Sequence, residues 1–160
     1  MDWGYILDLV YEFAYFIGVF IIFLMFAVFK GRQAVMNVIF GLYLALLITL
    51  EFPNYETLFG NQSGPVAALA QLGLFAFITL LTTALAWRVM PDEFREERFE
   101  SLGKKTLLAL GATVLVMIFS FNVLPVTEFL NPGTPIQSLF APKVYFFWWL
   151  LLPLVILYLV

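Results

Sequence analysis

Five long apolar stretches take up most of the sequence, and shorter segments between them hold nearly all of its charge. The stretches run over residues 5–29, 34–50, 66–87, 106–124 and 146–160. A helix needs about 20 mostly apolar residues to cross the roughly 30 Å hydrocarbon core of a membrane. The second and fifth stretches are short, and Pro153 in the fifth predicts a kinked helix or a half-span. The pattern predicts an all-α, polytopic bundle of about five transmembrane helices.

The composition indicates that lipid must cover this chain. Of its 160 residues, 63% are hydrophobic and 12% are charged, whereas a soluble domain has about 25% charged residues. A chain of this length has too little interior to hide so much apolar surface from water. The stretches are also too long and too apolar for the strands of a membrane barrel. We therefore expect a single integral membrane domain over residues 1–160, with the lipid bilayer as a partner.

The basic residues predict the orientation of the helices. All but Lys143 lie between the first and second or between the third and fourth stretches, which must share one side of the membrane. These residues are Lys30, Arg32, Arg88, Arg95, Arg98, Lys104 and Lys105. Because lysine and arginine concentrate in cytoplasmic loops, we expect the N-terminus outside and the C-terminus inside.

Two of the connecting segments have a distinct character. Residues 91–103 combine acidic, basic and aromatic residues, which predicts an amphipathic helix on the cytoplasmic surface, either a solvated connector or a docking face for a partner. Its acidic residues balance the neighbouring basic ones, so we expect no strong attraction of this segment to anionic lipids. The segment 125–142 contains four prolines, which exclude one continuous helix. We expect it to lie at the outer interface.

Asp8 and Glu12 lie one helical turn apart at the start of the first stretch. The run 13–29 alone forms about 25 Å of helix, so both carboxylates can stay at the outer interface and avoid the energetic penalty of the membrane interior. Two interpretations remain open. The pair is either interfacial, or it is an entry site for cations or protons.

Small residues at helical spacing predict where helices pack closely. In the first stretch, Ala14 and Gly18 lie opposite a stripe of phenylalanines at 13, 16, 20 and 23, so we expect the small residues to face inward and the phenylalanines to face lipid. Further small-residue faces comprise Gly73, Ala76, Thr79, Thr83 and Ala86 in the third stretch, and Gly111 and Ala112 in the fourth. We expect hydroxyl and amide groups to form hydrogen bonds between the helices there.

The residue types that carry most enzymatic chemistry are missing. The sequence contains no histidine and no cysteine, which excludes disulfides, thiolate chemistry and imidazole as metal ligand or general base. It has no metalloprotease motif, no paired aspartates within a stretch and no phosphate-binding loop. It also lacks the basic cluster typical of nucleic-acid binding. We expect no enzyme, no cofactor or metal, and no nucleic-acid partner.

The order of features resembles a known family. Asp8 opens the first stretch, a basic turn Lys30-Gly31-Arg32 follows, the second stretch ends near Pro53, and LGKKTLLALGAT leads into a further one. Over residues 8–124 this layout resembles that of the bacterial colicin V production protein family. The resemblance implies a protein of the bacterial inner membrane that is connected with toxin production or envelope upkeep and has no assigned catalytic residues.

Two classes of function follow from these observations. The first is a small scaffold or accessory protein that packs against other membrane proteins, against copies of itself or against lipids. The second is an oligomeric channel, or a carrier coupled to ions or protons, that uses Asp8 and Glu12. Five short spans are few for a carrier, and no inverted repeat is evident. We therefore expect the first class.

Overall fold

The computed structural model describes residues 3–51, 65–90, 102–122 and 135–160, and over these ranges the chain is helical without any strand. The helices are α1 (Trp3–Lys30), α2 (Arg32–Glu51), α4 (Pro65–Val89), α5 (Leu102–Asn122), α6 (Pro135–Phe140) and α7 (Lys143–Leu159). The predicted all-α class is confirmed. The predicted connector helix lies outside the described residues up to 101, and Leu102 and Gly103 belong to α5.

The five predicted stretches coincide with α1, α2, α4, α5 and α7. Of these helices, α1, α2, α4 and α5 are long and apolar enough to cross a membrane, and α7 is a shorter apolar helix of 17 residues. The helix α7 continues through Pro153 to Leu159. The described chain is therefore a bundle of four membrane-length helices and one shorter apolar helix.

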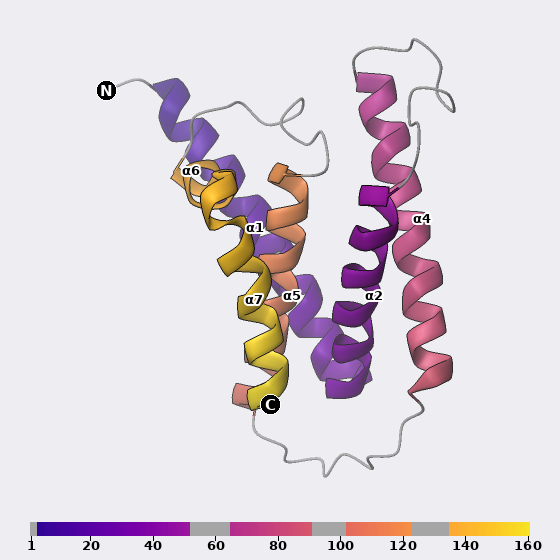
Figure 1. Cartoon of the computed structure of the whole chain (residues 1–160). Coiled ribbons are helices and arrows are strands. Elements are labelled where there is room, and N and C mark those ends of the chain that lie inside the picture. Colours follow the sequence, from indigo (N-terminus) through magenta and orange to yellow (C-terminus); the bar gives the residue numbers. More distant parts are fainter. Residues whose placement is uncertain (1–2, 52–64, 91–101, 123–134) are drawn as a thin grey trace.

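Successive long helices run in alternating directions, with α1 oblique to the others (Figure 1). A single residue, Gly31, joins α1 to α2, and its φ of 90° lies in the left-handed region that glycine adopts without steric penalty. The Gly31 N–H donates to the Ala27 carbonyl at 3.1 Å. This turn folds α1 and α2 into a hairpin and brings Lys30 and Arg32 to the same end of the bundle.

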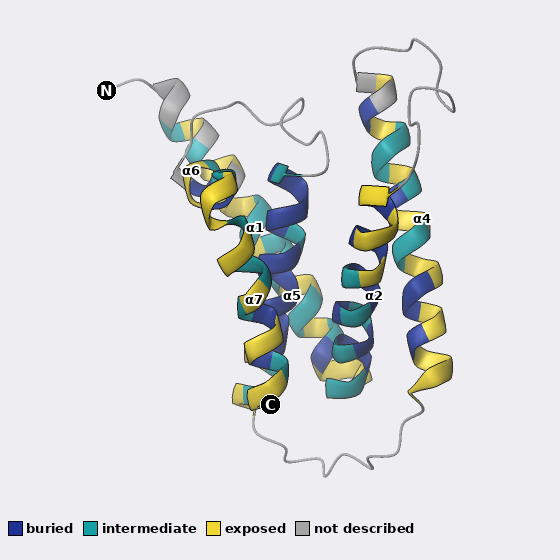
Figure 2. Ribbon diagram, in the orientation of Figure 1, coloured by how far each residue is buried: buried dark blue, intermediate teal, exposed yellow. Residues whose placement is uncertain are grey.

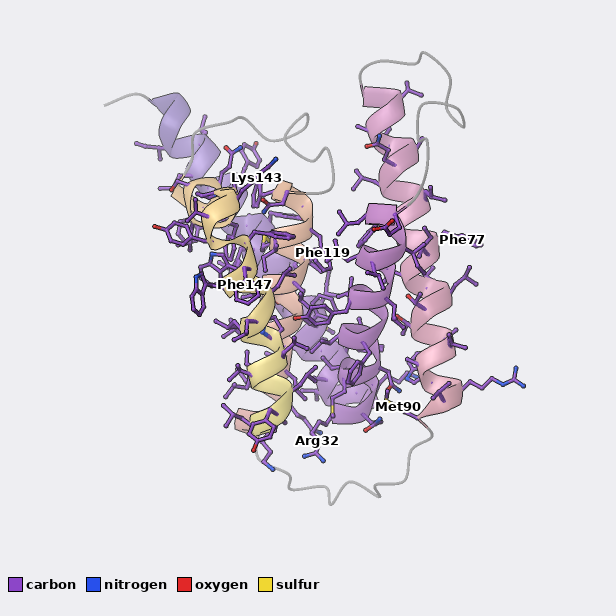
Figure 3. All side chains as sticks on the ribbon, viewed as in Figure 1. Arg32, Phe77, Met90, Phe119, Lys143 and Phe147 are labelled. Atoms are coloured by element: carbon purple, nitrogen blue, oxygen red, sulfur yellow. The ribbon has the colours of Figure 1, made fainter. Side chains whose placement is uncertain are left out.

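The helix α5 forms the centre of the bundle. It packs against α1, α2, α6 and α7, and 56% of its apolar window is buried. The Phe119 side chain is fully buried, and its ring meets that of Phe75 in α4 edge to face, with centroids 5.8 Å apart (Figure 3). The interior of the fold is therefore the region around α5 and the neighbouring face of α2.

The helices α1 and α4 lie at the outside of the bundle, where exposed positions predominate (Figure 2). Only 6% of the apolar window of α1 and 22% of that of α4 are buried. The helix α4 packs mainly against α2, and Phe77 projects from it away from the other helices (Figure 3). Their apolar faces need cover from lipid or from another protein.

The proline-rich segment contains a short helix that folds onto the bundle. Pro135 begins α6, and Pro142 immediately precedes α7. Asn122 donates from Nδ2 to the Phe140 carbonyl at 2.8 Å, and Trp149 donates from Nε1 to another α6 carbonyl at 3.0 Å. The prediction that prolines prevent one continuous helix here is confirmed. Its place at the membrane interface stays a prediction.

Candidate functional site

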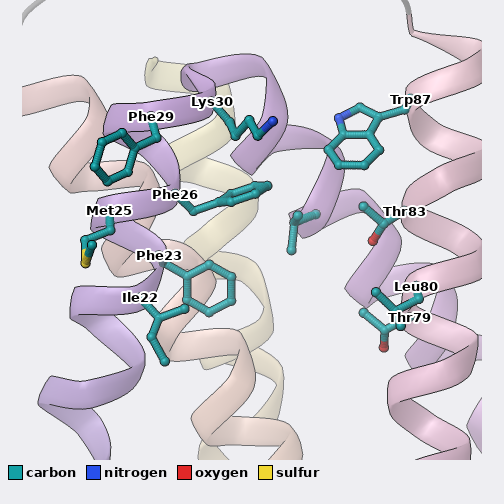
Figure 4. Close-up of a pocket in the computed structure, with 11 residues that line it drawn as sticks. Ile22, Phe23, Met25, Phe26, Phe29, Lys30, Thr79, Leu80, Thr83 and Trp87 are labelled. Carbon is teal, nitrogen blue, oxygen red and sulfur yellow. The ribbon is translucent and has the colours of Figure 1, made fainter.

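An apolar groove of about 650 Å³ lies between the last three turns of α1 and the facing part of α4. Phe23 and Phe26 point from α1 into the gap, and Leu80 and Thr83 face it from α4 (Figure 4). Val38 of α2 contributes to the lining from the helix between them. The groove thus follows the helix axes for about two turns.

The groove changes from apolar to cationic along its length. Lys30, the last residue of α1, points across the gap toward Trp87 of α4 (Figure 4). Trp87 lies two residues before the end of α4. Lysine and tryptophan are enriched where a membrane meets water. This end of the groove therefore matches headgroup level, and the part lined by phenylalanine and leucine matches hydrocarbon depth.

The groove is open because α4 is held against α2 rather than against α1. The Thr82 hydroxyl donates to the Gly41 carbonyl of α2 at 2.8 Å, a direct bond between the two helices. Thr83, which is buried, lies against Gly41 of α2 as well. The helices α1 and α4 each pack on α2 and leave space between themselves.

Most polar side chains in the helices bond to backbone carbonyls or to each other. Thr113 and Ser120 each donate to the carbonyl four residues earlier, at 2.7 Å. The hydroxyls of Tyr15 and Ser120, 2.9 Å apart, link α1 to α5. The Tyr43 hydroxyl donates to the Leu150 carbonyl and links α2 to α7. The last two bonds hold helices together, whereas the bonds of Thr113 and Ser120 to carbonyls lie within α5.

Asn37 in α2 is a buried exception. Its side chain is fully buried, and its Oδ1 accepts a hydrogen bond from Gln33 Nε2 at 3.3 Å. Its Nδ2 has no acceptor among the described residues. A buried amide donor without a partner costs about 1–3 kcal/mol. Its sequence position alone did not distinguish Asn37 from the other neutral polar residues.

The predicted acidic site cannot be assembled from the described side chains. Asp8 and Glu12 both lie in α1, four residues apart, toward the end opposite Lys30. Their side chains lie outside what the structure describes. The ion or proton site therefore stays a prediction.

The predicted rotation of α1 is wrong at Phe16, Phe23 and Ala14. Phe16 and Phe23 pack against the core, whereas Ala14 is exposed and a Cβ placed at Gly18 would meet nothing within 4 Å. The Tyr15 hydroxyl of the same helix reaches Ser120 of α5. Two phenylalanines of the predicted stripe thus pack inward, and Ala14 faces outward. Phe13, also expected to face lipid, is exposed.

The other predicted small-residue positions divide into two groups. Thr83, Ala86, Gly111 and Ala112 are buried, and a Cβ at Gly111 would lie 3.3 Å from Ile156 of α7. Thr79 is half-buried and lines the groove. Gly73 and Ala76 are exposed, and a Cβ at Gly73 would meet nothing within 4 Å. The prediction that those two positions pack is wrong within the described chain, because α2 covers only the later part of this face.

Gly41 was not among the predicted packing residues, although it forms the contact between α2 and α4. It is the only glycine in α2. Ala34, Asn37 and Ala45 lie in the same row, at spacings of three or four residues. The only available signal was that row of small or short side chains spaced three or four residues apart. Its importance depends on the helix that lies opposite, which the sequence of α2 does not identify.

Comparisons with models of protein families, with curated proteins and with solved structures find no match to this chain. The resemblance to the colicin V production proteins therefore remains an expectation drawn from the order of features. Function has to be argued from the groove, the exposed faces and the bonds between the helices.

Proposed function

We propose that this chain is a small multi-pass membrane scaffold or accessory protein, which acts by packing against other membrane proteins, second copies or lipids and catalyses no reaction. One observation carries the proposal. The interior is built mainly by α2 and α5, whereas only 6% of the apolar window of α1 and 22% of that of α4 are buried among the described residues. Exposed positions on α4 include Phe77, Leu80 and Leu81. Helices in membranes associate through such surfaces by close packing.

The bonding of polar groups supports a scaffold over a channel. A permeation path needs polar groups that are available to replace the water around an ion. The hydroxyls of Thr79, Thr113 and Ser120 are each occupied by a carbonyl of their own helix. Thr82 also reaches the neighbouring helix. The hydrogens of these hydroxyls are used within the bundle, which supports a structural role for the side chains.

We further propose that the end of the bundle with Lys30 and Arg32 faces the cytoplasm, in a bacterial inner membrane. Arg88, Lys104 and Lys105 lie near the ends of α4 and α5 at this same end, and Lys143 begins α7 at the opposite end (Figure 1). The excess of basic residues on one side supports a cytoplasmic assignment. With α1 running toward that side, the N-terminus lies outside and the C-terminus inside.

The test combines cross-linking in membranes with a transport assay. A photoreactive amino acid at Phe77 or Leu81 should form an adduct with a protein partner, with a second copy or with lipid. The same group at fully buried Leu115 should cross-link only within the chain. Purified protein in liposomes should show no cation or proton flux. A flux that disappears in Asp8→Asn and Glu12→Gln variants would overturn the proposal in favour of a channel or carrier.

A further inference from the structure

We infer that the groove between α1 and α4 binds the acyl chains of an anionic phospholipid, with Lys30 at the headgroup. The inference rests on the proposed function, in which lipids are among the partners that the protein packs against. It goes further by naming the lipid class, the site and the residue that selects the headgroup.

The groove lies between two helices that can span a membrane. Its walls are parts of two helices that are long and apolar enough to span a membrane, and it opens between them toward the outside of the bundle. Phe23, Phe26 and Leu80 give it an apolar surface (Figure 4). An apolar void in a membrane loses dispersion contacts that hydrocarbon would supply. Lipid chains are the hydrocarbon present at that depth.

Among the described residues that line the groove, Lys30 alone carries a charge. Lys30 is exposed, points over the end of the groove toward Trp87, and forms no ion pair with the described residues. A lysine at this depth attracts an anionic headgroup, and the neighbouring indole suits the interface between headgroups and hydrocarbon. A cation at one end and an apolar surface over the rest is the complement of an anionic amphiphile.

The change from an apolar to a cationic lining along the groove also makes a transmembrane helix a poor occupant. An apolar helix would fill the part lined by phenylalanine but would offer no countercharge to Lys30. An anionic phospholipid matches both parts, because its acyl chains fit the apolar part and its headgroup pairs with Lys30. Since the acidic residues of the segment 91–101 balance the basic residues in and next to it, the net positive charge at this end of the bundle comes from Lys30 and Arg32, and of these two only Lys30 lines the groove.

The experiment uses the full chain in nanodiscs that contain equal amounts of phosphatidylglycerol and phosphatidylcholine, with a photoreactive diazirine on the acyl chain of one or the other lipid. Cross-links are mapped to peptides of α1 and α4. We expect phosphatidylglycerol to label groove residues about fivefold more than phosphatidylcholine, the effect of one basic residue near a membrane surface. Lys30→Gln should bring the ratio close to one.

Two matched controls keep the result interpretable. Arg88→Gln removes a positive charge at the same end of the bundle from a residue that does not line the groove, so it should keep the preference. Leu80→Trp should reduce labelling of the groove by both lipids, because it fills the space. Leu81→Trp, at an exposed neighbour outside the groove lining, should leave labelling unchanged.

Two outcomes would overturn the inference. They are equal labelling of the groove by the two lipids, and an equal response to Lys30→Gln and Arg88→Gln. The scaffold proposal would survive either of them, because it is judged by partner cross-links and by flux.

Discussion

Gly41 in α2 lies so close to Thr83 in α4 that a Cβ at position 41 would be 2.2 Å from the Thr83 Oγ1 and 2.9 Å from its Cα. Because the Cα belongs to the backbone, rotation of a side chain could not relieve the overlap. The missing side chain at position 41 therefore sets the distance between the two helices, as small residues do at membrane helix contacts. This contact also positions α4, which forms one wall of the groove.

Gly41→Ala should force α2 and α4 apart and lower the stability of the protein by about 1–3 kcal/mol, the usual effect of overpacking a close contact. Thermal unfolding in detergent measures the change. Gly73→Ala in α4 is the control, because its Cβ would meet nothing within 4 Å and alanine is the better helix former. We expect its midpoint to be unchanged or higher. Equal midpoints for the two variants would contradict the close contact.

Gly31→Ala should destabilise the hairpin of α1 and α2 by about 1–2 kcal/mol, since a residue with a Cβ adopts positive φ only at that energetic cost. The φ of Gly31 is 90°. Gly18→Ala in α1 would place its Cβ in open space and should not destabilise. Chemical unfolding in mixed micelles would compare them, and an unaffected Gly31→Ala variant would argue against this turn.

Asn37 and Asn122 allow the same substitution to be compared in opposite situations. Asn37→Leu removes a buried Nδ2 that has no acceptor among the described residues, so stability should stay the same or increase. Asn122→Leu removes bonds to the carbonyls of Ile118 and Phe140 and should lower stability by about 1–3 kcal/mol. Unfolding midpoints check both. A large loss at Asn37 alone would indicate a partner for Nδ2 beyond the described residues.

The hydrogen bond between Tyr15 and Ser120 tests the inward rotation of α1. A double-mutant cycle with Tyr15→Phe and Ser120→Ala should give a coupling of about 0.6 kcal/mol, the average for such bonds between membrane helices. The free energies of unfolding of the four proteins supply the value. A coupling of zero would mean that α1 does not turn this face to α5.

The helices themselves were predictable because their signal is a long apolar run bounded by charge. The observed bounds of α1, α2, α4, α5 and α7 differ from the predicted ones by at most four residues. Charged residues occur in such runs only toward their ends, so the length of each run identifies its helix. Pro142 likewise explains the break between α6 and α7, because its fixed backbone geometry and missing N–H interrupt a helix.

The packing faces were less predictable, and α1 shows why. Nearly every position from Phe13 to Phe29 is apolar, so hydrophobicity does not distinguish the buried side from the lipid side as it does in a soluble helix. Which side packs is decided by shape and by single polar bonds, such as that of Tyr15 with Ser120. The groove depends on three helices and on the approach at Gly41, information that no single segment contains.

The apolar faces of α1 and α4 should lie within a membrane, and both the proposed function and the proposed lipid site depend on this. Because the chain has no cysteine, single cysteines can report on it without interference. Exposed Ile22 and Phe77 lie within α1 and α4, whereas Met90 follows the end of α4. In proteoliposomes with a water-soluble maleimide on both sides, Met90→Cys should react, and Ile22→Cys and Phe77→Cys should react only after denaturation. Equally fast labelling of all three in the intact vesicles would contradict the account.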